Sequence, residues 1–314
     1  MKGQLIIGEN EVIDDLDYRV KTAIKRLKTF EPKDGYYLAF SGGKDSIVIY
    51  ALAQMAGVKF DSHYAITTVD PPELTRFIKK YYPSVERIRP EINMWDLIVK
   101  KKAPPTRMVR YCCSTLKEGG GNQRTIITGV RWDESSRRKN TRKDVEYDTY
   151  GSQSKVAKEK RESFYLLNDN DEKRRMIESC VVKGKHIINP IIDWTDSHVW
   201  QFIKQYNIAY CELYDQGHKR LGCLGCQLQG KNIVNDFYMY PYVYVQYLKA
   251  FTRMIKARND EGLVTEWNTA HDVMQWWITM TDKEYIDFTV KLKEIMIQNN
   301  KKRYIKYLYQ EREE

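Results

Sequence analysis

The chain has 314 residues, of which 42% are hydrophobic and 30% are charged. This length and composition support one large or two ordinary domains with a real core, and they exclude a chain that is disordered as a whole. The 52 Lys and Arg outnumber the 42 Asp and Glu, which gives a formal net charge of +10 and a pI near 9.1. This balance suits polyanions such as nucleic acid or nucleotides, although a solvated basic surface fits it equally well.

The sequence shows no basic, apolar and small-residue pattern at its start, and no apolar run that approaches the ~18 residues of a membrane span. We therefore expect a cytoplasmic protein without a membrane partner. In a reducing compartment, the six cysteines are expected to be thiols or metal ligands rather than a disulfide framework.

The first 30 residues carry apolar side chains at helical spacing from Val12 to Leu27. Asn10 precedes them and has the side chain of a helix N-cap. The pattern predicts an N-terminal helix within residues 1–30 that packs beside the domain that follows.

A strand, a glycine turn and a helix follow in direct succession. Tyr36 to Phe40 is typical of a buried parallel strand, and Ile47 to Met55 predicts an apolar helix. Gly42 and Gly43 between them lack Cβ atoms, so backbone N–H groups can approach an anion closely at the helix N-terminus, where Lys44 adds a positive charge. This context favours a nucleotide phosphate site over an ordinary glycine turn.

The motif is not a Walker loop, because the Gly-x-x-x-x-Gly-Lys spacing is absent. It resembles the pyrophosphate loop (PP-loop) of the ATP pyrophosphatase superfamily, whose members split ATP between the α and β phosphates and adenylylate a substrate. The resemblance implies that the nucleotide-binding residues include Ser41, Gly42, Gly43, Lys44, Asp45 and Ser46.

Strand and helix patterns then alternate. Strands are expected at Tyr64 to Val69, Val85 to Ile88, Arg124 to Val130 and His186 to Ile192, and helices at Glu73 to Tyr82, Met94 to Lys101 and Ser197 to Tyr206, the last capped by Thr195. The alternation predicts an α/β fold with a doubly wound parallel sheet, which binds its ligand at the carboxyl ends of the strands. Thr67 and Thr68, at the end of the second strand, are expected beside adenine and ribose.

Residues 135–180 change character and are rich in Lys, Arg, Asp, Ser and Asn. They are interpreted as an insertion or mobile lid, from which Arg137 could close on an anion, or equally as a disordered linker. From Asn235 onward the chain is expected to be helical. Its many Tyr and Trp residues fit a core better than a platform on which bases stack.

Two cysteine clusters, Cys112-Cys113 and Cys223-Leu224-Gly225-Cys226, form a second constellation. A Cys-x-x-Cys pair can hold one metal centre, and four thiolates suit either zinc or a [4Fe–4S] cluster. Buried apolar cysteines are the simpler alternative, which the tight clustering disfavours.

Four segments now resemble the phosphoadenosine phosphosulfate (PAPS) reductase family over residues 36–230. They are Arg110 to Cys113, Thr128 to Ser135, Ile188 to Thr195, and Tyr214 to His218 leading into the Cys-x-x-Cys. The resemblance implies an adenine nucleotide alpha hydrolase-like domain over residues 31–230, followed by a helical region over residues 231–314. In the iron-sulfur adenylylsulfate reductases of that family the corresponding cysteines hold a [4Fe–4S] cluster, which implies the same for Cys112, Cys113, Cys223 and Cys226.

Cys180 could replace one member of the tandem pair. If three cysteines bind the cluster, one iron stays open for sulfur, as proposed for iron-sulfur tRNA thiolases of the PP-loop superfamily. Two departures weaken the reductase interpretation. No cysteine follows Cys226, whereas the reductases carry a mobile C-terminal Cys, and the loop is intact, as in ATP sulfurylase small subunits and DNA phosphorothioation proteins of the DndC type.

The leading hypothesis is an iron-sulfur ATP pyrophosphatase or adenylyltransferase that uses ATP and Mg²⁺ in sulfur metabolism or nucleic-acid thiolation, with a sulfur donor such as a cysteine desulfurase. Lys44, Asp45 and Arg131 are the expected catalytic residues, and Lys117, Gly129, Arg131 and Arg137 are expected near the α phosphate or substrate anion. The alternatives are an adenylylsulfate or phosphoadenylylsulfate reductase that borrows a partner's thiol, and a non-catalytic nucleotide-binding module associated with DNA.

Overall fold

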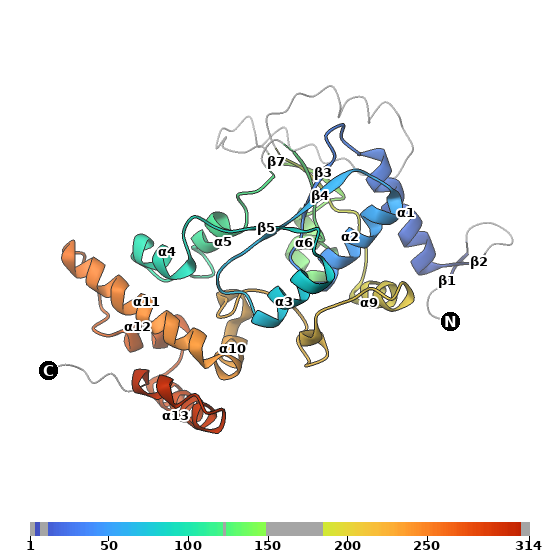
Figure 1. The fold of residues 1–314 in the computed structure, drawn as a ribbon. Coiled ribbons are helices and arrows are strands. Elements are labelled where there is room, and N and C mark those ends of the chain that lie inside the picture. Colours follow the sequence, from blue (N-terminus) through green and yellow to red (C-terminus); the bar gives the residue numbers. More distant parts are fainter. Residues whose placement is uncertain (1–3, 7–11, 122–123, 149–184, 309–314) are drawn as a thin grey trace. The chain divides into compact units, whose positions relative to one another are not determined.

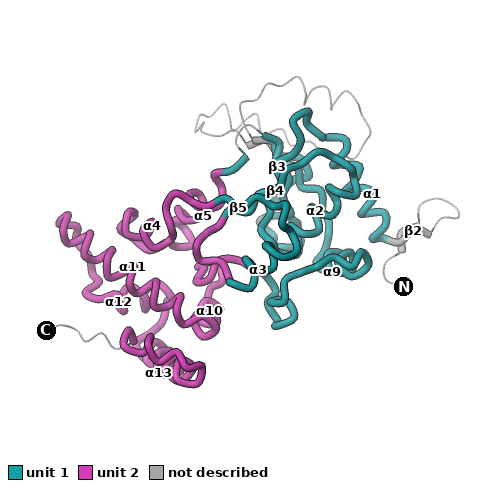
Figure 2. The backbone as a smooth tube through the Cα atoms, viewed as in Figure 1, with its two compact units in different colours: residues 1–65, 72–88, 120–221 teal, residues 66–71, 89–119, 222–314 magenta. Residues whose placement is uncertain are grey.

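A computed structural model describes residues 4–6, 12–121, 124–148 and 185–308 (Figure 1). The chain divides into two compact units, each built from several segments (Figure 2). Unit 1 contains residues 1–65, 72–88 and 120–221, and unit 2 contains residues 66–71, 89–119 and 222–314. The domain boundaries expected at residues 30 and 230 stay predictions.

Unit 1 is built on a six-stranded sheet in the order β5-β4-β3-β6-β8-β7. The first five strands in this order are parallel and β7 is antiparallel. The strands are β3 (Tyr36–Ala39), β4 (Phe60–Ala65), β5 (Glu86–Ile88), β6 (Thr125–Ile127), β7 (Val145–Asp148) and β8 (Lys185–Ile188). The expected doubly wound α/β fold is confirmed.

The helices of unit 1 follow their strands in the alternation that the sequence predicts. They are α1 (Asp15–Thr29), α2 (Lys44–Ala56), α3 (Pro72–Tyr81), α6 (Ser136–Thr141) and α9 (Asp196–Gln205), with 3₁₀ turns η1 (Trp132–Glu134) and η2 (Glu212–Tyr214). Helices α1, α2 and α9 pack against one another. The N-cap expected at Thr195 is confirmed, since its side chain accepts from the His198 N–H.

The strand order creates a switch point. The chain steps outward from β3 to β4 and β5, and then returns to place β6 on the other side of β3. In open α/β sheets, ligands bind outside the carboxyl ends of the strands where the order reverses in this way. The glycine turn after β3 and the residues after β6 therefore meet at one edge of unit 1.

The second strand lies earlier than expected, because β4 spans Phe60–Ala65 rather than Tyr64 to Val69. The chain turns after Ala65: Thr68 adopts a φ of 66°, and the Thr67 N–H donates to Asp70 at 2.7 Å. The fifth strand ends at Ile188, short of the expected Ile192, because Pro190 has no N–H to donate to a neighbouring strand.

The N-terminal helix begins later than expected. Val12–Asp14 forms β2, which pairs antiparallel with β1 (Gln4–Ile6), and α1 starts at Asp15. The proposed N-cap Asn10 lies outside the described residues. Acidic side chains at Asp15 and Asp17 complement the N-terminal dipole of the helix.

Most of the expected insertion, including Cys180, lies outside the described residues. Its first part has structure that the composition did not indicate: α6 is followed by β7, which pairs with β8 at the edge of the sheet. Asn189 holds this edge, since its side chain donates to the Lys143 carbonyl at 2.7 Å and to Glu146 at 2.9 Å.

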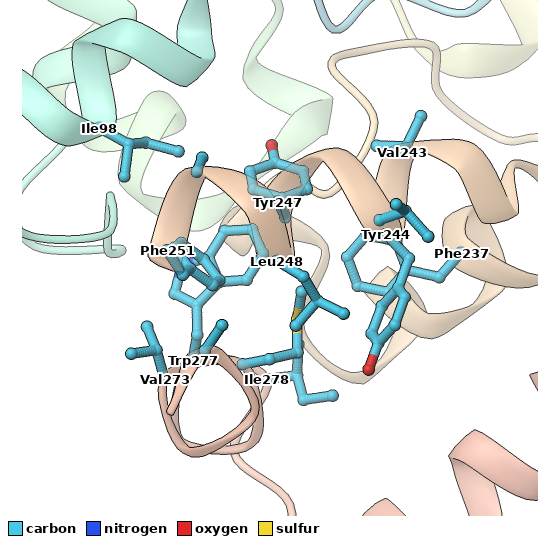
Figure 3. Packing of buried hydrophobic residues seen from close by; sticks show 14 of the residues in the cluster. Ile98, Phe237, Val243, Tyr244, Tyr247, Leu248, Phe251, Val273, Trp277 and Ile278 are labelled. Atoms are coloured by element: carbon cyan, nitrogen blue, oxygen red, sulfur yellow. The ribbon is translucent and has the colours of Figure 1, made fainter. Parts of the chain in front are cut away.

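Unit 2 is helical around α11. Its elements are α4 (Met94–Lys101), α5 (Tyr111–Leu116), η3 (Gln227–Asn232), α10 (Ile233–Met239), α11 (Pro241–Asp260), α12 (Ala270–Trp277), α13 (Asp282–Gln298) and η4 (Lys302–Tyr307). Helix α11 contacts α4, α10, α12 and η4. Aromatic side chains of α11 and α12 point toward one another in its core (Figure 3).

The expected core role of the C-terminal aromatic residues is confirmed for the best-buried ones. Tyr244, Tyr247 and Trp277 are at most 3% exposed, whereas Trp276 is 51% exposed. The rings of Tyr247 and Trp277 lie 4.6 Å apart, and the Trp277 indole donates to the Pro105 carbonyl at 2.6 Å. None of the helices in the described part of the chain is both long and apolar enough to cross a membrane.

We predict that Trp277→Ala lowers the free energy of unfolding by about 3–5 kcal/mol, because it empties a packed aromatic site and leaves a carbonyl without its donor. Its neighbour Trp276→Ala provides the matched control and should cost less than about 1 kcal/mol, since that ring already faces water. Urea unfolding followed by far-UV circular dichroism measures both. Equal losses would contradict the packing of α12.

Candidate functional site

The glycine turn lies at the carboxyl end of β3 and leads directly into α2. Gly43 is the N-cap of α2 and offers no side chain to bind the helix's first N–H groups. Such N–H groups carry the positive end of the helix dipole and bind anions well. This helix N-terminus therefore has the features that favour an anion, and the expected phosphate site stays a prediction.

Gly42 is required by both conformation and space. Its φ of 73° lies in the left-handed region that side chains rarely adopt. A Cβ at this position would lie 2.7 Å from Leu74 Cδ1 and 2.8 Å from Ile78 Cδ1. The turn is thus packed against α3, and its path is fixed.

The Tyr214 hydroxyl occupies the start of α2. It accepts the Lys44 backbone N–H at 2.8 Å, and the Lys44 ammonium lies 5.8 Å from the centre of the Tyr214 ring. Burial raises the pKa of Tyr214, so the phenol stays neutral and can both accept and donate hydrogen bonds. Tyr214 therefore satisfies the first backbone N–H of α2.

The Lys44 side chain is nearly buried, with 6% of the residue exposed. Its ammonium pairs with Asp196 at 3.1 Å and donates to the Lys219 carbonyl at 3.1 Å. The positive charge expected to face phosphate is therefore held, in this structure, by the first residue of α9.

Arg131 lies at the centre of the site and is 2% exposed. Its Nε donates to Asp45 at 2.7 Å, its Nη2 to Asp196 at 3.0 Å, and its Nη1 to the Trp194 carbonyl at 3.3 Å. Burial opposes the charge, but the pKa of Arg131 is raised because Asp45 and Asp196 stabilise the guanidinium. As placed, Arg131 donates to two carboxylates and lies 3.5 Å from a third, that of Asp133, rather than facing a substrate anion.

The other unit 1 residues expected in the site lie beside this group. Ser41 Oγ is 3.3 Å from Ser46 Oγ, and Ser46 Oγ donates to the Gly43 carbonyl at 2.8 Å. A Cβ at Gly129 would lie 2.9 Å from Asp45 Cβ, so the end of β6 approaches α2 closely. Arg137 lies in α6, but its side chain is outside the described part of the structure.

The remaining predicted residues belong to unit 2. Thr67 is buried and Thr68 is exposed, and the Thr68 hydroxyl accepts the N–H of Met94 at the start of α4 at 2.9 Å. Both threonines are therefore explained by local structure as well as by a nucleotide. Their expected place beside adenine and ribose stays a prediction.

The Cys-x-x-Cys turn is fixed by three hydrogen bonds within unit 2. Leu224 N–H donates to the Val69 carbonyl at 2.8 Å, Gly225 N–H donates to Asp236 at 2.8 Å, and the Leu224 carbonyl accepts from Tyr247 at 3.1 Å. Gly225 has a φ of 73°, and a Cβ there would lie 2.6 Å from the Tyr247 ring. A glycine between the two cysteines is therefore obligatory.

The two cysteine clusters belong to the same unit, and all four cysteines are half-buried. Interaction with Cys113 and burial raise the pKa of Cys112, which also feels the charges of Cys223 and Cys226. The pKa of Cys113 falls to about 5, because Cys112 and Arg110 donate to its sulfur; Arg110 Nη2 lies 3.2 Å away. The four thiols thus share one electrostatic environment.

Lys117 adds a second cation to this group. Burial lowers the pKa of Lys117, but Cys223 and Asp70 outweigh it and keep the ammonium charged. Cys223 Sγ also lies 3.5 Å from Thr67 Oγ1. In the described ranges, however, no three His, Cys, Asp or Glu side chains form a group spaced to hold a metal ion. The donor chemistry fits a cluster, while the ligand shell is not closed.

The sequence profile of the phosphoadenosine phosphosulfate reductase domain matches residues 35–229, which is more than half of the chain. The chain belongs to this family. The matched range contains the glycine turn, Arg131 and all four clustered cysteines.

Known relatives of this PAPS reductase family chain include two uncharacterized proteins of Methanocaldococcus jannaschii. They are 25% and 28% identical over 68% and 71% of this chain. The chain spans less than half of their length, 47% and 42%. An adenosine 5′-phosphosulfate reductase of Staphylococcus haemolyticus is 24% identical over 62% of this chain and 70% of its own length.

Two solved structures are similar to the chain. Phosphoadenylyl-sulfate reductase from Candida auris, in complex with phosphate, matches 70% of this chain and 98% of its own with a TM-score of 0.39 and 16% identity. Candida glabrata FMN adenylyltransferase with FAD and pyrophosphate matches 66% and 63% with a TM-score of 0.43 and 14% identity. Both likenesses are remote, and the family assignment rests on the sequence match.

Sequence reasoning missed two residues of the group around Lys44. The sequence pattern indicates only a helix that starts near Asp196 and a family segment that begins at Tyr214, yet both side chains bind the first residue of α2. Their position in the sequence gave no sign of this, because they lie more than 150 residues from the turn they contact.

We predict that Arg131→Met destabilises the protein by about 3 kcal/mol, since it removes the buried partner of Asp45 and leaves Asp196 with Lys44 alone. The matched control is Arg76→Met, which removes an exposed arginine paired with Glu73 and should cost at most about 1 kcal/mol. Thermal and urea unfolding of both variants supply the comparison. An equally small loss in Arg131→Met would show that the ion pairs do not hold the site together.

Proposed function

We propose that this PAPS reductase family protein is an ATP pyrophosphatase or adenylyltransferase that transfers AMP to an acceptor and releases pyrophosphate. The observation that carries the proposal is the N-terminus of α2, where the N-cap Gly43 provides no side-chain cap, directly after an intact Ser-Gly-Gly-Lys-Asp-Ser turn at the switch point of the sheet. Three features there favour an anion: the helix dipole, the backbone N–H groups of the first turn and the Lys44 ammonium.

In the proposed reaction, an acceptor oxygen attacks the α phosphorus of ATP, and the bond from that phosphorus to the bridging oxygen of the β phosphate breaks. Pyrophosphate leaves with the electron pair of that bond. The N–H groups of α2 and the Lys44 ammonium would hold the β and γ phosphates and stabilise the charge on the leaving group. Tyr214 would donate to a phosphate oxygen from the same side.

ATP binding requires Lys44 to exchange its partner. Its ammonium leaves the Asp196 carboxylate and binds phosphate, whereas Arg131 retains both Asp45 and Asp196. The exchange conserves the hydrogen bonding of a nearly buried ammonium, so its cost is modest. Arg131 is then a positioning residue.

Mg²⁺ would neutralise phosphate charge in this reaction. Asp45 is the candidate protein ligand, because one of its oxygens is held by Arg131 and no hydrogen bond or ion pair to the other is formed within the described chain. A carboxylate oxygen is the ligand type that Mg²⁺ prefers.

The four clustered cysteines are proposed to hold a [4Fe–4S] cluster, with zinc as the alternative. Four half-buried thiols in one unit, with Arg110 and Lys117 beside them, supply the donors and the compensating charge. The cluster would supply a sulfur-binding or electron-transfer centre. Adenylyl transfer and a cysteine-bound cluster are both used in sulfur metabolism or nucleic-acid thiolation, with a sulfur donor such as a cysteine desulfurase, and we propose this setting.

The second candidate function is reduction of adenylylsulfate or phosphoadenylylsulfate with a thiol from a partner protein. The curated adenosine 5′-phosphosulfate reductase relatives favour it. The 314 residues have no cysteine after Cys226, so the attacking thiolate would come from outside the chain. A non-catalytic nucleotide-binding module is a third candidate, and the intact turn weighs against it.

We predict that purified protein with ATP and Mg²⁺ produces AMP and pyrophosphate, and that Lys44→Gln reduces this activity at least about 100-fold, since the variant loses a phosphate-bound charge. Lys79→Gln, on the exposed face of α3, should retain full activity. Product chromatography distinguishes AMP from ADP. Formation of ADP, or sulfite release from adenylylsulfate without ATP cleavage, would replace this function with another.

We predict that protein purified without oxygen contains about four iron and four sulfide per chain. Serine variants of Cys112, Cys113, Cys223 and Cys226 should lose the iron, while Cys211→Ala, a buried cysteine outside the cluster, should keep it. Iron and sulfide assays with visible absorption decide the matter. Loss of iron in Cys180→Ser together with retention in Cys112→Ser or Cys113→Ser would establish the alternative ligand set, and one zinc per chain would exclude the cluster.

A further inference from the structure

A groove of about 430 Å³ lies in unit 2, outside the two sites described above. Helices α4 and α11 form its walls, and Tyr307 of η4 lies at its edge. Trp95, Lys249 and Arg253 line it together with Gln246 and other polar side chains. Its size is sufficient for a small planar ligand group such as a nucleobase.

The outer face of α11 explains the polar lining. Its buried side chains pack into the core of unit 2, whereas Gln246, Lys249, Arg253 and Lys256 follow one another at spacings of three and four residues. Residues at this spacing share one face of a helix. The long helix therefore presents a straight row of one amide and three cations, two of which line the groove.

Tyr307 has two ammonium groups over its ring. Lys249 Nζ lies 4.8 Å and Lys306 Nζ 5.3 Å from the ring centre. Within the ranges that the structure describes, neither lysine forms an ion pair with a carboxylate. Two like charges near one half-buried ring repel each other, and an anion bound beside either ammonium group would reduce that repulsion.

Only part of this charge is compensated on the protein. Arg253 pairs with Asp96 at 2.8 Å, and both side chains are about half exposed. Lys302, Arg303 and Lys306 follow in η4 without an acidic residue among them, and Arg303 lies against the ring of Tyr304. Cations and aromatic rings thus alternate along η4, and its last residue, Tyr307, lines the groove.

We infer that this basic and aromatic face, defined by Trp95, Lys249, Arg253, Lys306 and Tyr307, binds single-stranded nucleic acid. Aromatic rings for the bases and cations for the phosphates are the two components that such sites combine. Trp95 is suited to stacking because its ring is fixed edge-on against the buried Tyr247 ring at 4.9 Å. An acidic peptide would use the cations but leave the half-buried rings unused.

The inference names an acceptor class and in that respect rests on the adenylyl transfer proposed above. Binding is measured without ATP, so the two can fail separately. If the protein binds oligonucleotides but forms no AMP, the proposed adenylyl transfer is wrong and the proposed binding surface stands. ATP cleavage without oligonucleotide binding would remove the surface alone.

The test is fluorescence anisotropy of labelled oligo(U) and oligo(dT), titrated with the full-length chain over a range of salt concentrations. We expect Lys249→Gln/Lys306→Gln to weaken binding and to reduce the slope of log affinity against log salt by about 1.4, since each contact with a single-strand phosphate contributes about 0.7. Tyr307→Ala should weaken binding roughly fivefold or more, while Tyr307→Phe should retain it, because stacking needs the ring and not the hydroxyl.

The matched control is Lys21→Gln/Lys28→Gln, which removes the same charge from the exposed lysines of α1. It should leave the salt slope unchanged. Equal effects of the two double variants would show that net charge alone drives binding and would overturn the inference. So would a duplex bound more tightly than either single strand, or unchanged affinity in Tyr307→Ala. Circular dichroism confirms that each variant is folded.

Discussion

The bond between the buried Arg131 guanidinium and Asp45 is the interaction on which the organisation of unit 1 depends. It joins the segment after β6 to the first turn of α2, and the same guanidinium reaches Asp196 at the start of α9. A planar group with several fixed donors can orient two carboxylates at once, which a lysine could not do. The glycine turn and the helix that follows it are consequently tied to the segment after β6 and to α9. Within this group of described residues, Lys44 is the cation that can change its partner without breaking the Arg131 pairs.

In unit 2, a hydrophobic core rather than a buried ion pair fixes the position of the functional turn. Tyr247 is fully enclosed among the aromatic side chains of α11 and α12 (Figure 3), and its hydroxyl still reaches the Leu224 carbonyl in the Cys-x-x-Cys turn. Asp236, the other anchor, binds the Gly225 N–H from α10. The aromatic content of the C-terminal helices therefore does more than fill space: it fixes the backbone that presents two of the four cysteines. The opposite face of α11 does not contact this turn, and it carries the polar and basic side chains.

Much of this was accessible from sequence because it is local. The strand, glycine turn and helix from Tyr36 to Met55 are encoded by consecutive residues. The same holds for the helix from Met94 to Lys101, whose two ends match the prediction, and for the N-cap at Thr195. Predictions failed at strand ends and in the segment where a distant strand provides the pairing partner. β4 ends four residues before the expected Val69 because the chain turns at Thr68, and β7 forms in a segment whose composition indicated a lid or linker.

The sequence by itself determined the alternating α/β pattern, the glycine turn before α2 and the two cysteine pairs, since each depends on side-chain type at short spacing. Only the tertiary structure decided the partners. It assigned Lys44 to Asp196, Arg131 to two carboxylates, and Tyr214 to the start of α2. It also grouped residues 89–119 with the C-terminal helices. The physical reason is that a buried charge must find its counter-charge wherever the fold supplies one, and the order of strands in the sheet, which no local pattern records, determines which distant segments meet.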